Sequence, residues 1–195
     1  MSWREGKLAG WELVRNMISA VFLDRDGVIN VDHGYVSTWE QFEFLPGAPE
    51  ALRELQDAGY LLIIVSNQSG IGRGYYSERD LHTLNQAIAE HLDSTLCVTL
   101  SGFYHCPHHP TEAEGEFRQQ CDCRKPAPGM IQQAVLDHGI DVKTSLLVGD
   151  KDSDIEAGRA AGVGRLFKVV DSAQSGASAP DIQFVTALSE VPSLL

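Results

Sequence analysis

The chain has 195 residues and a formal net charge of −12, with 27 acidic side chains against 15 lysines and arginines. A chain of this length can bury a core without disulfides or a structural metal, so we expect a single domain. The acidic balance argues against sequence-independent nucleic-acid binding, which needs a basic surface. No stretch approaches the ~18 apolar residues of a membrane span, and residues 1–17 lack a signal-peptide pattern. We expect a cytoplasmic protein that binds neither nucleic acid nor membranes.

Short apolar segments predict buried strands, and amphipathic segments between them predict helices. The strands are expected over 18–23, 60–66, 101–106, 145–149 and 164–170. Apolar residues recur at helical spacing from Ala48, and again from Leu81 after a Ser77 cap. This alternation predicts a doubly wound α/β domain with a parallel sheet over residues 18–195. Residues 1–17 would be an N-terminal extension, and the Ser- and Ala-rich segment DSAQSGASAPD a loop or tail.

Polar residues follow four of the expected strands, whose carboxyl ends meet at the ligand-binding edge of such a sheet. In chain order they are Asp24, Asp26, Ser66, Arg124, Lys125, Asp150 and Lys151. Two aspartates in an isolated DRDG sequence are equally typical of a solvated turn. The convergence of a hydroxyl, a lysine and further carboxylates on the same edge favours a functional site instead.

This combination predicts phosphoryl transfer to an aspartate. Asp24 and Asp150 would hold Mg²⁺, a hard cation that prefers carboxylates, phosphate oxygens and water. Ser66 and Lys125 would bind the phosphoryl oxygens, over which charge spreads in the transition state. Asp24 would attack phosphorus, and Asp26 would protonate the leaving alcohol and later activate water. The expected substrate is a small phosphate monoester.

The motifs DRDG, SNQSG, CRKP and GDKDSD stand in the order found in the haloacid dehalogenase-like phosphatases. The resemblance covers nearly all of residues 18–170. With VDHGYV and CPHHP included, the chain is most similar to the heptose bisphosphate phosphatases of that superfamily. The resemblance implies a Rossmann-like sheet without a large cap domain. It also implies removal of the C7 phosphate of a D-glycero-D-manno-heptose 1,7-bisphosphate, in ADP-heptose and lipopolysaccharide biosynthesis, with the preferred anomer left open.

The resemblance further implies individual roles. The backbone carbonyl of Asp26 would join the two carboxylates as a magnesium ligand, and Arg124 would contact the substrate's second phosphate. The implied substrate contacts also include Asp32, His33, Gly34, Tyr35, Ser66, Asn67, Gln68, Ser69 and Lys125. Ser66 stands where threonine is common in the family and keeps the hydroxyl. Lys151 is expected to steer its neighbour Asp150 or to touch the substrate.

A second metal site is expected in residues 106–123, called the cysteine loop below. The expected ligands, which form C-x-H, a 12-residue insert and C-x-C, are Cys106, His108, Cys121 and Cys123. Four such donors suit a closed, structural zinc site, in which His109 is the alternative to His108. A disulfide competes with this interpretation, although three cysteines leave one unpaired. The zinc would order the loop as a small substitute for a cap, while Cys97, in LCVTL, is expected to be a buried hydrophobic side chain.

Two other functions stay open at this point. A histidinol-phosphate phosphatase also carries DRDG and a zinc cluster, but it typically has a shorter insert and lacks the DHGY context. A phospho-aspartate receiver domain also gathers aspartates, a hydroxyl and a lysine, but it places its acidic pair and its phosphorylated aspartate on different strands. We expect a monomer, because the sequence shows neither a coiled coil nor an obvious interface.

Overall fold

The computed structural model of the chain describes residues 18–171 and 179–195. The expected N-terminal extension and residues 172–178 of the expected C-terminal loop lie outside the described residues. In the part that is described, no helix is both long enough and apolar enough to span a membrane.

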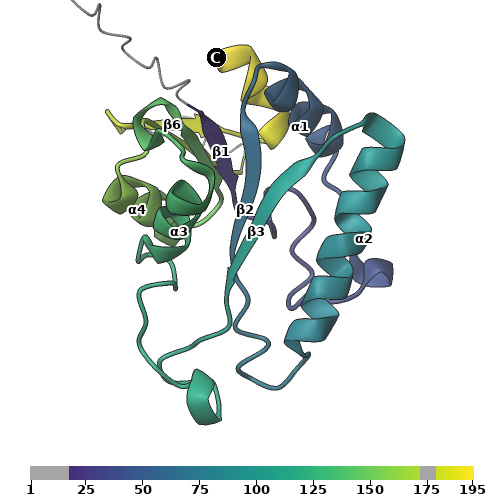
Figure 1. Cartoon of the computed structure of the whole chain (residues 1–195), viewed down its shortest axis with the longest axis vertical. Coiled ribbons are helices and arrows are strands. Elements are labelled where there is room, and N and C mark those ends of the chain that lie inside the picture. The colour runs from purple at the N-terminus through teal and green to yellow at the C-terminus, as the bar shows by residue number, and fades with distance from the viewer. Residues whose placement is uncertain (1–17, 172–178) are drawn as a thin grey trace, which may run out of the picture.

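One parallel sheet forms the centre of the structure (Figure 1). Its strand order is β3-β2-β1-β4-β5-β6. The strands are β1 (Ala20–Leu23), β2 (Leu61–Asn67), β3 (Leu100–Cys106), β4 (Leu146–Gly149), β5 (Arg165–Val169) and β6 (Ile182–Val185). The first five confirm the strands expected from the apolar segments, and the doubly wound parallel sheet is confirmed with them. The sequence analysis did not anticipate β6, which pairs in parallel with β5.

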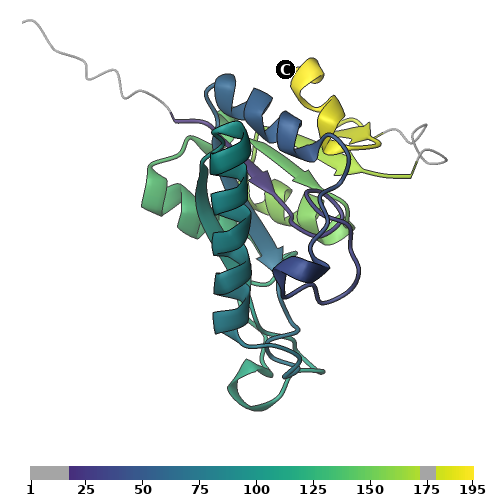
Figure 2. The same ribbon diagram turned by 90° about the vertical axis from the view of Figure 1, so that its right-hand side faces the viewer.

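Helices cover both faces of the sheet (Figures 1 and 2). They are α1 (Ala48–Asp57), α2 (Glu78–Leu96), α3 (Gly129–His138) and α4 (Asp152–Ala161). The helices α1 and α2 pack on one face, whereas α3 and α4 pack on the other. Each face therefore has its own apolar core, because strands covered on both sides alternate their side chains between two helical layers.

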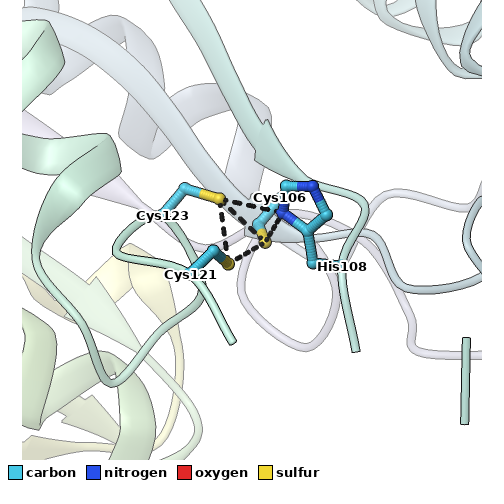
Figure 3. A group of neighbouring side chains, drawn as sticks. All are labelled: Cys106, His108, Cys121 and Cys123. Atoms are coloured by element: carbon cyan, nitrogen blue, oxygen red, sulfur yellow. Dashed lines mark hydrogen bonds between the residues drawn. The ribbon is translucent and has the colours of Figure 1, made fainter. Parts of the chain in front are cut away.

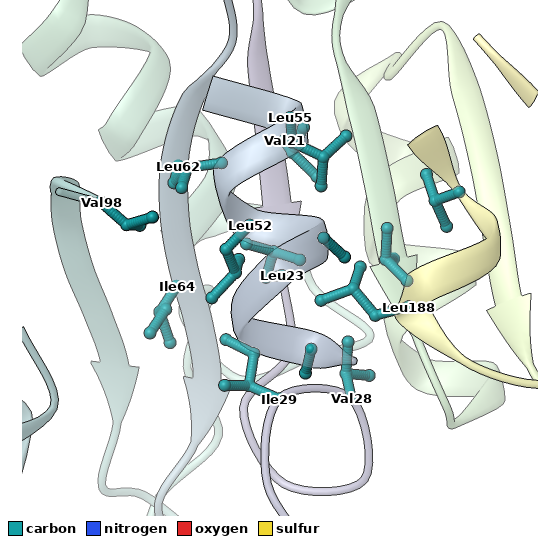
Figure 4. Packing of buried hydrophobic residues seen from close by; sticks show 14 of the residues in the cluster. Val21, Leu23, Val28, Ile29, Leu52, Leu55, Leu62, Ile64, Val98 and Leu188 are labelled. Atoms are coloured by element: carbon teal, nitrogen blue, oxygen red, sulfur yellow. The ribbon is translucent and has the colours of Figure 1, made fainter. Parts of the chain in front are cut away.

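In the core under α1, the spacing of apolar residues along a strand and a helix brings their side chains into one layer (Figure 4). Val21 and Leu23, two residues apart on β1, point to the same layer and are fully buried. Leu52 and Leu55, three residues apart on α1, belong to the same core cluster as Val21 and Leu23. Burying one such side chain contributes about 1.5–3 kcal/mol of transfer free energy.

The helix α2 begins and ends at recognisable caps. The Ser77 hydroxyl accepts the Asp80 backbone N–H at 3.2 Å, and the Asp80 carboxylate accepts the Ser77 N–H at 2.8 Å. This capping box confirms the predicted start of the helix. The helix ends at Cys97, which takes a left-handed conformation with φ of 53° and is exposed. The expectation of a buried Cys97 was therefore wrong, because α2 ends at Leu96, the first residue of the apolar stretch, and the capping residue Cys97 faces outward.

All six strands are parallel, so their carboxyl ends lie at one edge of the sheet. The cysteine loop, which includes the short helical turn Gly115–Phe117, extends from this edge at the bottom of Figure 1. The loops that follow β1, β2 and β4 gather at the same edge, where the candidate site lies.

Candidate active site

Asp24 is the first residue after β1, and main-chain contacts fix its position. Its backbone N–H donates to the Val148 carbonyl at 3.0 Å, which extends the pairing of β1 with β4 by one residue. Its buried carboxylate accepts, through Oδ1, the backbone N–H of Arg25 at 2.8 Å and the ammonium group of Lys125 at 3.0 Å. Asp24 is thus oriented by donors from two separate parts of the chain.

Lys125 is a buried cation between carboxylates. Its Nζ lies 3.0 Å from Asp24 Oδ1, 2.6 Å from Asp154 Oδ1 and 2.8 Å from the Val65 carbonyl. Burial by itself lowers the pKa of Lys125, but the two carboxylates outweigh it and the net shift is upward. Burial and the charge of Asp24 raise the pKa of Asp154, although the Lys125 ammonium group lowers it. The single positive charge of Lys125 therefore does not compensate for the negative charge of the neighbouring carboxylates.

Three carboxylates could hold a metal ion at this point. Oxygens of Asp24, Asp150 and Asp154 lie within 4.8 Å of one another. Asp150 Oδ1 is buried and has no hydrogen-bond partner, and burial raises the pKa of Asp150 to about 7. A set of hard oxygen donors with an unpaired buried oxygen and uncompensated negative charge fits a Mg²⁺-sized cation. The sequence predicted Asp24 and Asp150 as metal ligands, and the structure brings Asp154 to the same point.

Glycines allow these groups to approach one another. Gly27 has a φ of 84°, and a Cβ on it would lie 2.6 Å from Asp150 Oδ2. A Cβ on Gly149 would lie 2.2 Å from the Cβ of Asp154. The last residue of DRDG is therefore a glycine for a steric reason, because the turn after β1 packs directly against the carboxylate that follows β4.

Hydrogen-bond donors surround Asp26. Arg25 Nη2 lies 3.0 and 3.1 Å from the two carboxylate oxygens, and Asn30 Nδ2 lies 3.0 Å from Oδ1. The Arg25 side chain is buried, and its Nη2 also donates to the Val36 carbonyl at 2.7 Å. Neither Arg25 nor Asn30 could be predicted from the sequence, because an arginine in a polar turn normally extends into solvent.

Side chains at the carboxyl end of β2 serve two different purposes. Asn67 pairs with the main chain of Lys125, donating to its carbonyl at 3.1 Å and accepting its N–H at 3.0 Å. Ser66 is buried at the end of β2, and its Oγ accepts a hydrogen bond from Gln68 at 2.8 Å. The segment thus holds the lysine in place and also presents the hydroxyl predicted to bind phosphate.

A cavity of about 320 Å³ opens beside Asp26. Its walls are Asp26, Asp32, Gly34, Tyr35, Asn67, Gln68, Ser69, Tyr76 and Lys151. Most residues that the sequence analysis expected to contact substrate are therefore brought together. His33 instead pairs with Glu43 at 3.2 Å and lines a neighbouring hollow, and Arg124 donates to the His108 carbonyl at 3.1 Å. Neither of these two side chains lines the cavity.

A larger cavity of about 540 Å³ lies on the other side of Gly27 and Asp150, against the ends of β5 and β6. Its walls include Asp150 but not Asp26, and neither cavity is lined by Ser66 or Lys125. Of the two, the smaller cavity contains Asp26, the carboxylate expected to act as proton donor, and it is the candidate substrate site.

The thiol and imidazole ligands predicted for zinc converge (Figure 3). Cys123 Sγ lies 3.1 Å from Cys106 Sγ, 3.2 Å from Cys121 Sγ and 3.3 Å from His108 Nδ1. Three soft sulfur atoms and one imidazole nitrogen at these separations fit the donor set of a small tetrahedral metal site. The four cysteines of the chain are free thiols, so the structure contains no disulfide in this cluster.

The geometry distinguishes the two histidines that the sequence left open. His108 Nδ1 faces the thiols, whereas His109 Nδ1 accepts the backbone N–H groups of Glu112 at 3.0 Å and Thr111 at 3.3 Å. His109 is therefore held in a turn of the cysteine loop, and His108 is the histidine that joins the three thiols in the candidate metal cluster.

The cysteine loop also supports residues 69–76, called the glycine segment below. The Glu114 N–H donates to the Gly72 carbonyl at 2.7 Å, and a Cβ on Gly72 would lie 2.5 Å from the Pro107 oxygen. Arg73 pairs with Glu112 and lies over the ring of Tyr35, 5.6 Å from its centroid. A contact path thus joins the cysteine loop to the cavity wall.

Comparisons with known proteins agree with this geometry. Residues 122–168 match the model of the HAD-hydrolase-like family. Haemophilus ducreyi D-glycero-beta-D-manno-heptose-1,7-bisphosphate 7-phosphatase is 53% identical over 144 residues, which are 74% of this chain and 79% of that protein. The protein of the same name from Escherichia coli K12 is 50% identical over 150 residues, covering 75% and 76% of the two chains.

Solved structures of phosphatases are also similar to this chain. The structure of D,D-heptose 1,7-bisphosphate phosphatase from B. bronchiseptica, complexed with magnesium and phosphate, has a TM-score of 0.78 at 25% identity. It covers 91% of this chain, which spans 97% of that structure. A HAD-like phosphatase from Mesorhizobium loti has a TM-score of 0.80 at 33% identity, covering 91% and 84% of the two chains.

Proposed function

Because the chain belongs to the family of the D-glycero-β-D-manno-heptose-1,7-bisphosphate 7-phosphatases, within the haloacid dehalogenase-like phosphatases, we propose that it removes the C7 phosphate of this sugar. The observation that carries the proposal is the group formed by the buried Asp24 and Lys125 and the partly buried Asp150, next to a cavity that contains Asp26. The names of the relatives support the β anomer and, with it, a place in ADP-heptose and lipopolysaccharide biosynthesis.

Asp24 would act as the nucleophile. Its Oδ1 is held by two donors, so the carboxylate presents itself in one orientation and little rotational freedom is lost on reaction. Mg²⁺ held by Asp24, Asp150 and the Asp26 carbonyl would neutralise the charge that otherwise repels a carboxylate from a phosphate. Lys125 adds a fixed positive charge, and Ser66 adds a hydroxyl donor for the phosphoryl oxygens.

Asp26 would transfer the proton in both halves of the reaction. As the bond from Asp24 to phosphorus forms, the bond from phosphorus to the C7 oxygen breaks, and Asp26 protonates that oxygen. Water then attacks the aspartyl-phosphate, Asp26 takes its proton, and inorganic phosphate leaves with the Asp24 carboxylate regenerated. Asp26 lines the cavity and is positioned by its donors, so a substrate alcohol bound there lies beside it.

The cysteine cluster would hold a structural Zn²⁺. The support is its donor set of three thiols and one imidazole, which leaves no position open for catalysis once all four bind. Its free thiols fit a reducing compartment, which supports a cytoplasmic location. We further propose that residues 18–195 form one catalytic domain, since a single sheet includes strands from Ala20 to Val185, and that this domain acts as a monomer.

The test is a comparison of kcat/KM in Mg²⁺ for the α and β forms of heptose 1,7-bisphosphate and for histidinol phosphate. Asp24→Asn is the blank, because it keeps the shape of the side chain and removes the nucleophile. A preference for the β heptose that disappears in the blank is expected. Faster turnover of histidinol phosphate would overturn the substrate. A phosphoryl-protein that accumulates without turnover would instead support a receiver domain.

A further inference from the structure

A hydrogen-bond chain leads from the cavity wall to two of the proposed catalytic groups. Tyr76 Oη lies 2.6 Å from Gln68 Oε1. Gln68 Nε2 lies 2.8 Å from Ser66 Oγ and 3.2 Å from Asp26 Oδ2. Gln68 and Ser66 are both buried. The sequence motifs make Gln68 a substrate contact and give Tyr76 no role, yet the two side chains bond to each other and to the site.

The chemistry of the partners determines the direction of each hydrogen bond. Asp26 accepts hydrogen bonds from Arg25 on both carboxylate oxygens and from Asn30 on Oδ1, and in this acceptor role it faces the amide NH₂ group of Gln68, whose oxygen faces away. Tyr76 must then donate, because an amide oxygen only accepts. The NH₂ group also donates to Ser66 Oγ, which leaves the Ser66 proton free for a phosphoryl oxygen. The chain therefore runs in one direction, from Tyr76 toward the substrate.

Two features keep Tyr76 in position as a donor. Gly70 gives its ring room, since a Cβ on Gly70 would lie 2.2 Å from the Tyr76 ring atom Cε1. Burial raises the pKa of Tyr76 to about 12, so the hydroxyl keeps its proton well above neutral pH.

We infer that Tyr76 and Gln68 are positioning residues that turn the Ser66 hydroxyl toward the phosphoryl group and hold the Asp26 carboxylate in place. The inference rests on the proposed function and deepens it. Without Tyr76, the Gln68 amide can rotate and present its oxygen to Ser66, which would then donate to Gln68 instead of to phosphate. The Ser66 bond to phosphate matters most where charge develops in the transition state, so its loss lowers kcat rather than raising KM.

The experiment is Tyr76→Phe, which removes the hydroxyl and keeps the ring. The matched control is Tyr104→Phe, which removes a hydroxyl that donates to Asp137 at 2.8 Å, away from the site. Both kcat and KM are measured in Mg²⁺ on p-nitrophenyl phosphate and on β-heptose 1,7-bisphosphate. Tyr76→Phe should lower kcat about fivefold with little change in KM, the cost of one neutral hydrogen bond. The control should match the wild type.

A double-mutant cycle separates positioning from packing. In a Gln68→Leu background, Tyr76→Phe should have no further effect on kcat, because the amide through which it acts is gone. An equal loss in both backgrounds, a rise in KM alone, or a wild-type kcat would each overturn the inference. If Tyr76→Phe unfolds at the assay temperature, Gly70→Ala displaces the ring without removing a polar atom and serves in the same cycle.

The two proposals fail in different ways. If the wild type hydrolyses p-nitrophenyl phosphate but not the heptose bisphosphate, the proposed substrate is wrong, and the cycle on the small ester still decides the role of Tyr76. If the heptose is hydrolysed and the cycle is additive, the proposed function stands and the positioning role is lost.

Discussion

Lys125→Met should destabilise the fold strongly, as well as impair catalysis. The substitution keeps most of the aliphatic stem but removes the ammonium group from between Asp24, at 3.0 Å, and Asp154, at 2.6 Å. Lys125 is 3% exposed, so water does not replace the lost cation. Two buried carboxylates are then left facing each other and Asp150.

The magnitude follows from these distances. At an effective dielectric constant of about 20, Coulomb's law gives attractions of about 5.5 and about 6.5 kcal/mol for the two pairs. Burying the ammonium group offsets several kcal/mol of that attraction, and removing one partner of a buried pair typically costs about 3–5 kcal/mol. We expect a loss of about 3–5 kcal/mol in the free energy of unfolding, a large share of the ~5–15 kcal/mol of an ordinary domain.

The assay is urea unfolding in Mg²⁺-free buffer, followed by circular dichroism. The control is Lys143→Met on an exposed lysine, which should stay within about 0.5 kcal/mol of the wild type. The raised pKa of Lys125 means that its contribution is complete below its ordinary pKa and is lost only as pH rises through the higher folded value, so the deficit should persist to about pH 9. Added Mg²⁺ should recover part of the free energy of unfolding that Lys125→Met loses. A loss no larger than the control's would refute the view that this ammonium group holds the carboxylates together.

Cys123→Ser should lose bound zinc by metal analysis and raise KM, whereas Cys97→Ser, at an exposed thiol, should change neither. Retention of full zinc by Cys123→Ser would remove this residue from the cluster. Ser77→Ala should lower the free energy of unfolding by about 1 kcal/mol in urea, because the hydrogen bonds of the Ser77 hydroxyl to Asp80 at the start of α2 are lost. Gly72→Ala should raise KM with zinc retained, since its Cβ would lie 2.5 Å from the Pro107 oxygen and displace the glycine segment. An unchanged KM would mean that this contact does not shape the cavity.

The secondary structure followed from sequence where the pattern was strong. Strands buried on both faces are continuous apolar runs, and the Ser77 cap marked the start of α2. The strand β6 was missed because IQFV is short and alternates partly buried and exposed residues at the edge of the sheet. Cys97 was misjudged because apolar composition does not show where a helix stops and which way its capping residue points.

The sequence predicted the ionisable groups of the site but not the residues that hold them in position. Aspartates at strand ends carry a recognisable spacing, whereas Arg25, Asn30 and Tyr76 look like ordinary loop residues in the sequence. Arg25 is buried only because the loop that carries Val36 folds over it and supplies a carbonyl acceptor. Such a contact joins residues eleven positions apart through a turn whose path no local pattern specifies.

The sequence by itself determined the parallel sheet and the chemical identity of the groups, because spacing and hydrophobic period act locally along the chain, and its motifs carried the resemblance to the family. The tertiary structure alone decided which groups meet: Lys125 between Asp24 and Asp154, His108 rather than His109 at the thiols, and Tyr76 behind Gln68. The physical reason is that burial, shared carboxylate charge and hydrogen-bond direction depend on segments far apart in the chain, and these become neighbours only when the strand ends converge.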